Sequence, residues 1–291
     1  ILDVNYIREM NKAFNSGSGD VVTSYRASKN YGGGICAMGA SVGFVRECRF
    51  VHTPRTLLNI STHISGTGFL ASSKILNPKN GWSYTCITED AEFSLDNIKM
   101  GNKIIYCDDA IFYDEQPTTW KQTYRQRMRW QKGAYLVFSA FSLSYIWRMV
   151  KSFSFTFYDN LMYFSPITTV STGWAILNGF VALIRSFITL LTGAPVVPEI
   201  LSLLGSLLYS FLMLYLGLFV FGSLAVIKDW ERIKATKKQK LLSMLTYPIF
   251  IICLTPIYFI ALFKKVEWKP INHTAGVNIE DLNVQEQKSQ K

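Results

Sequence analysis

The pattern of hydrophobic and polar positions divides the chain into two unlike parts. Residues 1–130 change period repeatedly and are interrupted by glycine-containing turns at 17–19, 32–34 and 80–81, as in an α/β domain with short connections. Within this part the pattern predicts two helices, at Asp3–Phe14 and Glu89–Met100, and two short strands, at Val21–Tyr25 and Lys103–Cys107.

Three uncharged stretches dominate the second part. They cover residues 160–184, 200–227 and 244–263, and each is long enough to cross a hydrocarbon core of about 30 Å as a helix. Before them, between residues 120 and 151, cationic residues alternate with aromatic ones, which is typical of helices lying in a membrane interface. We therefore predict interfacial helices followed by about three transmembrane helices.

A cluster of basic residues separates the second and third stretches. Six lysines and arginines lie within residues 228–240, whereas Arg185 is the one basic residue between the first and second stretches. The positive-inside rule places the basic loop in the cytoplasm.

This orientation conflicts with the end of the chain, because a third crossing would put the lysines at 264–265 outside. Three solutions stay open. The tail is external, or the third stretch, which contains Pro248 and Pro256, does not cross, or residues 153–191 contain an extra pass. The two lysines and Trp268 favour a cytoplasmic tail.

Composition and charge narrow the class of protein. Hydrophobic residues make up 49% of the chain and charged residues 17%, and only three charged residues occur between positions 153 and 227. This distribution excludes a simple soluble enzyme, and the 14% of aromatic residues excludes a disordered chain. The net charge of the chain is +10, and its basic residues cluster beside the apolar runs. There they suit anionic lipid headgroups better than nucleic acid. We expect a lipid bilayer and no nucleic acid as partner.

The five cysteines show no spacing typical of a metal knuckle or a redox motif, which favours a reduced compartment. No signal peptide precedes the α/β part, and the chain opens with Ile1 rather than methionine. We therefore expect a fragment of a longer protein.

Two short motifs carry the candidate chemistry. Thr88-Glu89-Asp90 begins a predicted helix, where Thr88 is expected to be the N-cap. Gln126, Arg129 and Trp130 form a Q-x-x-R-W motif further along. Each motif alone is as consistent with an acidic helix start or an interfacial cationic helix, but their order before apolar stretches indicates an enzyme.

With these motifs in this order, the chain resembles the membrane-embedded family-2 glycosyltransferases, which include cellulose, chitin, hyaluronan and poly-N-acetylglucosamine synthases. Residues 65–69 (Ser-Gly-Thr-Gly-Phe) and 113–117 (Tyr-Asp-Glu-Gln-Pro) add to the resemblance. It implies a GT-A type α/β domain on the cytoplasmic face of the plasma membrane, a UDP-sugar donor, and a divalent metal, Mg or Mn. The metal-binding D-x-D motif of the family is expected upstream of Ile1, so the metal ligands would lie outside this chain and the chain alone would be inactive.

The resemblance assigns roles to particular residues. Asp90 is expected to be the catalytic base, since inverting transfer needs a base within hydrogen-bond reach of the acceptor hydroxyl. Arg129, with Gln126 beside it, is expected to bind the leaving diphosphate, because a guanidinium donates in a planar fork. Trp130 could stack beneath a sugar or anchor the helix at the interface. The expected acceptor-binding residues are Gly66, Thr67, Gly68 and Glu89.

Other candidates have simpler interpretations. We interpret Asp108 and Asp109 as a strand end rather than a metal site, and Arg26 and Lys29 as a solvated face. The three histidines, His52, His63 and His273, are expected to be core or loop residues rather than ligands.

The sequence thus predicts four regions: a partial GT-A domain at 1–130 that holds the acceptor half, interfacial helices at 131–157, transmembrane helices at 158–263, and a polar tail at 264–291. The predicted fold class is α/β followed by an α-helical transmembrane region. The predicted function is inverting transfer from a UDP-sugar, with N-acetylglucosamine preferred, to a growing β-linked polysaccharide coupled to translocation. The alternatives are a non-processive enzyme with a lipid acceptor and a non-catalytic transport or scaffold protein.

Overall fold

A three-stranded mixed sheet forms the centre of the α/β part. The computed structural model describes residues 1–192 and 197–266. Strand β1 (Val21–Ser28) lies between β2 (Phe69–Ala71), with which it is antiparallel, and β3 (Ile104–Asp114), with which it is parallel. The helices predicted at 3–14 and 89–100 correspond to α1 (Tyr6–Asn15) and α5 (Glu89–Met100).

Strand β1 is buried on both of its faces because helices cover the sheet on each side. Val21 packs in a cluster with Phe93 of α5, whereas the next residue, Val22, packs against Met10 of α1. Successive side chains of a strand point to opposite faces, so the two adjacent valines belong to two separate hydrophobic clusters. The predicted strands are confirmed, although β3 runs seven residues beyond Cys107.

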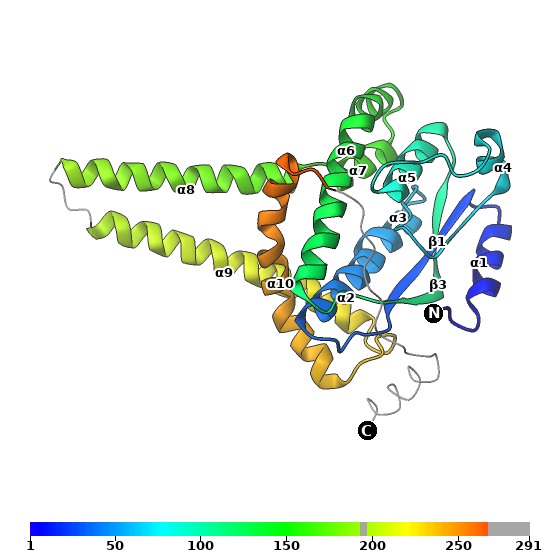
Figure 1. Cartoon of the computed structure of the whole chain (residues 1–291), viewed down its shortest axis with the longest axis horizontal. Helices are drawn as coiled ribbons and strands as arrows, with labels where there is room; N and C mark the ends of the chain where they lie inside the picture. The colour runs from blue at the N-terminus through cyan, green and yellow to red at the C-terminus, as the bar shows by residue number, and fades with distance from the viewer. Residues whose placement is uncertain (193–196, 267–291) are drawn as a thin grey trace.

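Short helices connect these elements. They are α2 (Ile35–Glu47), the π-helical turn η1 (Cys48–His52) and α3 (Thr53–Leu57) between β1 and β2, and α4 (Ser73–Leu76) and the 3-10 turn η2 (Asn77–Lys79) before α5. Helix α2 lies between the sheet and the helices of the second part (Figure 1).

The longest helix, α6 (Trp120–Ser152), joins the two parts. Its 33 residues extend for about 50 Å, and it continues without a break through the boundary expected between residues 130 and 131. It is followed by α7 (Phe155–Phe164), whose ten residues are too few to cross a bilayer. The described residues between 153 and 191 therefore contain no extra pass.

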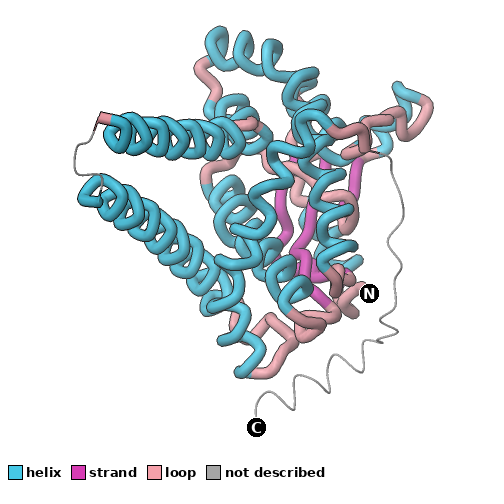
Figure 2. Tube along the Cα trace, turned by 60° about the vertical axis from the view of Figure 1, so that its left-hand side comes forward, coloured by secondary structure: helices cyan, strands magenta, loops and turns pink. Residues whose placement is uncertain are grey.

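The next two helices form a long hairpin. Helices α8 (Ile167–Leu191) and α9 (Val197–Lys228) project from the body on the side away from the sheet (Figures 1 and 2). Together with α10 (Lys237–Phe263) they are long and apolar enough to cross a membrane. None of the most apolar window of α8 is buried in protein, against 33% of that of α10. The hairpin therefore presents an apolar surface suited to lipid.

Helix α10 lies differently from the hairpin. It runs across the base of α8 and α9 and packs against α2 and α6 (Figure 1). Phe250 occupies the space above Gly39 of α2, where a Cβ atom would come within 2.3 Å of its ring. Near the end of α10, Lys132 of α6 donates to the carbonyl of Leu262 at 3.1 Å. This arrangement favours the solution in which the third stretch does not cross.

The loop between α9 and α10 is bound to the α/β part by ion pairs. Asp229 accepts from Arg49 with an Nε–Oδ1 distance of 2.7 Å, and Arg232 lies 2.9 Å from Asp108. The expectation that Asp108 and Asp109 end a strand is wrong, because β3 continues to Asp114 and the two residues lie at a register shift opposite β1. Their position at this irregularity turns Asp108 toward the two arginines.

Candidate active site

A single cavity of about 570 Å³ gathers most of the candidate residues. Helices α2, α5, α6 and α10 and the loop at 63–67 supply its walls. The cavity therefore lies between the α/β part and the helix that crosses the base of the hairpin. Seven of the eight candidates line or border it, as described below.

Asp90 reaches the cavity from the first turn of α5. The helix begins at Glu89 with Thr88 as its N-cap residue, as expected, but the Thr88 hydroxyl makes no capping hydrogen bond to the described residues. Thr88 is instead packed beneath Gly133 of α6, where a Cβ atom would lie 2.2 Å from its hydroxyl oxygen. The start of the helix is held by Glu92, whose carboxylate accepts from the backbone N–H groups at 85 and 86 at 3.0 and 2.9 Å.

The surroundings of Asp90 change its acidity. Burial raises the pKa of Asp90 to about 6, and the Glu89 carboxylate adds to the rise, while the Ala91 backbone N–H and the charge of Arg129 oppose it. A carboxyl group with a pKa near neutrality is ionised at pH 7 yet still accepts a proton readily. Asp90 therefore has the acidity that a general base needs.

The loop at 65–68 approaches Asp90 directly. Gly66 has a φ of 81°, and a Cβ atom there would lie 3.3 Å from Oδ2 of Asp90. Ile64 N donates to Ser94 Oγ at 3.0 Å, which ties this loop to α5. Thr67 and Glu89 also line the cavity, whereas Gly68 packs against Phe112 outside it. The structure thus brings three of the four expected acceptor residues to the cavity.

The Q-x-x-R-W residues enter from α6. Arg129 donates to the carbonyl of Ile87 at 2.9 Å, which places its guanidinium at the approach to α5. Trp130 contacts Phe44 edge-on, with 5.9 Å between ring centroids. Gln126 lines the cavity, and its Oε1 is buried without a hydrogen-bond partner among the described residues. A carboxylate, a guanidinium and an unsatisfied amide thus face one space.

Sequence analysis missed an ion pair at the edge of the sheet. Arg26 of β1 is not solvated: its side chain pairs with Asp114 of β3, at 3.1 Å from Nε, and donates to Ser65 O at 3.0 Å. Both charged residues line the cavity. Their position at the carboxyl ends of adjacent parallel strands, where ligands commonly bind in α/β sheets, was the signal that could have found them.

Further lining residues come from α2, to which sequence analysis gave no role, and from α6 and α10, which it treated as interfacial or membrane helices. They are Arg46 and Glu47 of α2, Arg127 of α6, and Tyr247 and Tyr258 of α10. Only the packing of α10 onto α2 and α6 brings them together, so no local pattern could have indicated them.

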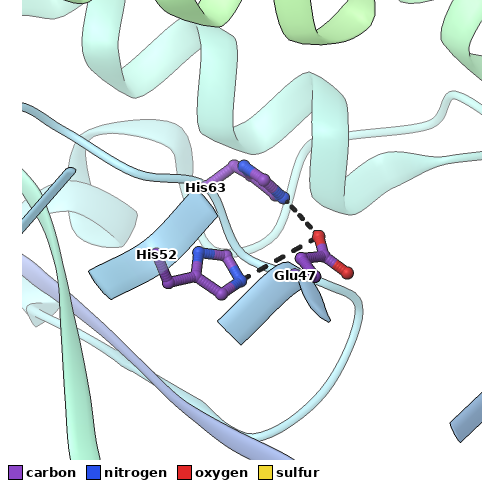
Figure 3. Close-up of side chains that lie close together, drawn as sticks. All are labelled: Glu47, His52 and His63. Atoms are coloured by element: carbon purple, nitrogen blue, oxygen red, sulfur yellow. Dashed lines mark hydrogen bonds and ion pairs between the residues drawn. The ribbon is translucent and has the colours of Figure 1, made fainter. Parts of the chain in front are cut away.

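Glu47 is the centre of a buried network beside the cavity (Figure 3). Its Oε1 accepts from His63 Nε2 at 2.8 Å and from the Tyr163 hydroxyl at 2.7 Å, and His52 Nε2 lies 3.9 Å away. Burial lowers the pKa of His52 to about 3. The two histidines are core residues, as expected, and His273 lies outside the described residues.

The Glu47, His52 and His63 side chains are close enough together to suggest a metal site. Their hydrogen bonds do not suit the divalent metal that the family resemblance implies. Arg55 donates to His63 Nδ1 at 2.7 Å, and arginine cannot accept a hydrogen bond. His63 must therefore carry its proton on Nε2, where a metal would bind. Mg and Mn also prefer oxygen ligands, so this cluster is a hydrogen-bonded support for Glu47.

Comparison with known proteins identifies the family of the chain. A family model described as "Glycosyl transferase family group 2" matches residues 2–262. A segment of 70 residues is 34% identical to the "Probable glycosyltransferase YdaM" of Bacillus subtilis (strain 168), and this alignment covers 24% of the present chain and 17% of that protein. The family implies a GT-A fold, with which the mixed sheet between helices agrees. Because the family model covers most of its length, this chain belongs to the family-2 glycosyltransferases.

Proposed function

We propose that the protein transfers a sugar, with inversion, from a UDP-sugar to a hydroxyl of a membrane-associated acceptor, and that Asp90 is the catalytic base. The observation that carries the proposal is a buried carboxylate with a pKa of about 6 beside Gly66, in a cavity that Arg129 and Gln126 also line. We take N-acetylglucosamine as the preferred sugar and a growing β-linked polysaccharide as the leading acceptor.

The reaction follows from these positions. Asp90 takes the proton of the acceptor hydroxyl while the hydroxyl oxygen bonds to the anomeric carbon. The bond between that carbon and the diphosphate oxygen breaks on the opposite face, so the diphosphate departs with the electron pair and the configuration inverts. Arg129 stabilises the negative charge that develops on the diphosphate. Gln126 donates a hydrogen bond beside it, and Trp130 offers a flat face to the acceptor.

The remaining candidates position the acceptor. Thr67 and Glu89 line the cavity next to Asp90 and can hydrogen-bond to its hydroxyl groups. Gly66 lets the loop approach the base without a side chain in the way. A divalent metal would neutralise the diphosphate when bound, and its ligands are expected upstream of Ile1.

We propose that the α8–α9 hairpin spans the plasma membrane and that the α/β part lies in the cytoplasm, where UDP-sugars are made. The basic loop between α9 and α10 contacts the α/β part through Asp229 and Arg232, so the positive-inside rule orients both together. Helix α10 then lies along the cytoplasmic interface and leaves Lys264 and Lys265 on the same side.

A lipid acceptor and a non-processive reaction form the second candidate function. It is favoured by arginines that lack carboxylate partners at the α10 end of the cavity, Arg46 and Arg127. The length of the product made by the full-length enzyme separates the two candidates, since a processive enzyme yields long chains and a non-processive one adds a single sugar.

Asp90→Asn in the full-length enzyme tests the sugar transfer that both candidate functions have in common. Removing a general base while keeping its shape costs about 10²- to 10⁴-fold in rate. Turnover of radiolabelled UDP-sugar by isolated membranes should fall by that amount, while UDP binding should persist because the uracil and metal contacts are expected upstream.

Asp109→Asn is the matched control, because the Asp109 side chain is 72% exposed and is not among the residues that line the cavity. Glu92→Gln is unsuitable, since Glu92 holds the start of α5. If the Asp90→Asn enzyme transfers sugar at the wild-type rate, Thr88-Glu89-Asp90 only begins a helix, and the proposed mechanism is wrong.

A further inference from the structure

Two arginines that line the cavity, the exposed Arg46 and the half-buried Arg127, lack the carboxylate partners that four other arginines have. Arg46 and Arg127 make no hydrogen bond or ion pair with any residue that the structure describes, and Nε of Arg127 is buried and unsatisfied. By contrast, four arginines of the α/β part and its loop each pair with a carboxylate: Arg26 with Asp114, Arg49 with Asp229, Arg55 with Asp159, and Arg232 with Asp108.

The two unpaired arginines share one location. Tyr247 and Tyr258 of α10 and Glu47 of α2 are electrostatic neighbours of both. Oε1 of Glu47 already accepts from His63 and Tyr163. Asp90 has a different pair of cationic neighbours, Arg129 and Arg26. The cavity therefore holds the proposed base and, apart from it, two arginines that form no hydrogen bond or ion pair with a carboxylate of the described residues.

The charge of Arg127 lies in unfavourable surroundings. Its guanidinium lies 4.6 Å from the ring centroid of Trp130 and 5.9 Å from that of Phe250, which gives it aromatic neighbours, while Glu47 is near enough to act on its charge without forming an ion pair. Burial lowers the pKa of Arg127 to about 10, so the group is still charged at pH 7. A buried charge without a counterion is unfavourable, and an anionic ligand would relieve it.

The donor set suits a phosphate group. Two guanidinium forks can each donate two parallel hydrogen bonds to adjacent oxygens. The hydroxyls of Tyr247 and Tyr258 make no hydrogen bond within the described part of the chain and line the same cavity. These groups together can donate to more oxygens than the two of a carboxylate.

The wall beside these donors is apolar. Phe250, Ile251, Leu254 and Ile257 of α10 line the cavity, and the opposite side of α10 exposes large apolar residues such as Leu245 and Ile249. A ligand that meets both the arginines and this wall needs an anionic group next to a hydrocarbon chain. This requirement distinguishes a lipid from a free phosphate compound.

We propose that Arg46 and Arg127 bind the phosphate of a lipid-linked acceptor, whose hydrocarbon chain lies along α10 and whose hydroxyl-bearing group reaches Asp90. The inference rests on the proposed glycosyl transfer and selects the second candidate acceptor, a lipid, over the polysaccharide. Tyr247 and Tyr258 donate to the remaining phosphate oxygens. The reaction is unchanged, since the phosphate takes no part in bond making or breaking.

The experiment uses the full-length enzyme in dodecyl maltoside and phosphatidic acid that carries a photoreactive diazirine in its acyl chain. Illumination should label α10, because the chain lies against Ile251 and Leu254. Unlabelled phosphatidic acid should compete. Diacylglycerol, which lacks the phosphate, and glycerol 3-phosphate, which lacks the chains, should each compete about tenfold less well or worse, since each loses one half of the contacts.

Variants test the arginines. Arg46→Gln and Arg127→Gln should each reduce labelling about tenfold, because each removes one charge-assisted fork. Arg125→Gln, on an exposed position of the same helix α6, should leave labelling unchanged. Removing an unpaired cation strands no carboxylate, so the variants should fold, and a single gel-filtration peak checks this. Arg127→Lys keeps the charge without the fork and should label to an intermediate extent.

Two results would overturn the proposal: equal labelling of wild type and both glutamine variants, or competition by glycerol 3-phosphate as strong as that by phosphatidic acid. Labelling needs no turnover, so the Asp90→Asn enzyme should label like wild type. Loss of the proposed sugar transfer and loss of the lipid phosphate subsite therefore give different results.

Discussion

At the scale of single residues, the site depends on how burial and neighbouring charges act on Asp90. Its carboxyl group is enclosed by α5, α6 and the loop at Gly66, and this enclosure disfavours the charged form. Arg129 and Arg26 offset the effect only in part, since neither forms an ion pair with it in the described structure. The balance gives a base that is stronger than an ordinary aspartate.

This balance predicts the pH dependence of the enzyme. The base acts as the carboxylate, so kcat/KM should fall as the pH drops through about 6, the pKa of Asp90, rather than through the value near 4 of an ordinary aspartate. Glu89→Gln removes a like charge and should move this acidic limb to lower pH. A rate that stays constant from pH 7 to about 5 would contradict the assignment of Asp90 as base.

At the scale of elements, a buried ion-pair network fixes α9 to the sheet. Arg49, in η1 directly after α2, donates to both carboxylate oxygens of Asp229 at 2.7 Å and to Asp108 of β3 at 2.9 Å. The Tyr25 hydroxyl of β1 donates to Asp229 at 3.1 Å. The side chain of Asp229 is only 1% exposed. The network therefore fixes the position of the α8–α9 hairpin relative to the sheet.

Breaking this network should destabilise the protein. Asp229→Ala leaves Arg49 buried with only the half-exposed Asp108 as counterion, and removing one partner of a buried pair costs about 3–5 kcal/mol. Thermal unfolding in detergent should show a clearly lower Tm. Glu231→Ala, two residues away on an exposed position, should leave Tm unchanged. The double variant Arg49→Met, Asp229→Ala should recover part of the loss, because no unpaired charge remains, and a failure to recover would show that the charge is not the cause.

At the scale of the whole molecule, the direction of α10 decides the topology. Helix α8 exposes apolar residues all round and α9 does so over most of its length, whereas α10 buries one side against α2 and α6 and crosses the base of the hairpin (Figure 1). A helix held in this way lies parallel to the bilayer surface if the hairpin spans it. The cavity then opens at the membrane interface, where an acceptor can enter from the lipid.

Cysteine labelling tests this topology in intact cells that produce the full-length protein with Cys253 replaced by serine. Cysteines at the exposed positions Lys238 and Lys265, on either side of α10, should both resist an impermeant thiol reagent until the cells are lysed. A cysteine at Thr192, at the tip of the hairpin, should react in intact cells. If Lys238→Cys and Lys265→Cys differ in accessibility, α10 crosses the membrane.

The sequence by itself determined the features that local patterns encode. Alternation and turn residues predicted β1, β3 and α5, and length with hydropathy predicted the helices α8 and α9. The order of the two motifs, through the family resemblance that it carries, predicted Asp90 and Arg129 as candidate site residues, and both line the cavity.

Only the tertiary structure decided what depends on contacts between distant segments. An apolar stretch such as 244–263 has the same composition whether it spans a bilayer or packs on protein, and the close fit of Phe250 over Gly39 is what turns α10 across the hairpin. The same packing brings Arg46 and Arg127, 81 residues apart in the sequence, into one cavity, where neither forms an ion pair with a carboxylate of the described residues. No periodicity relates these two arginines, since their proximity arises from how three helices meet.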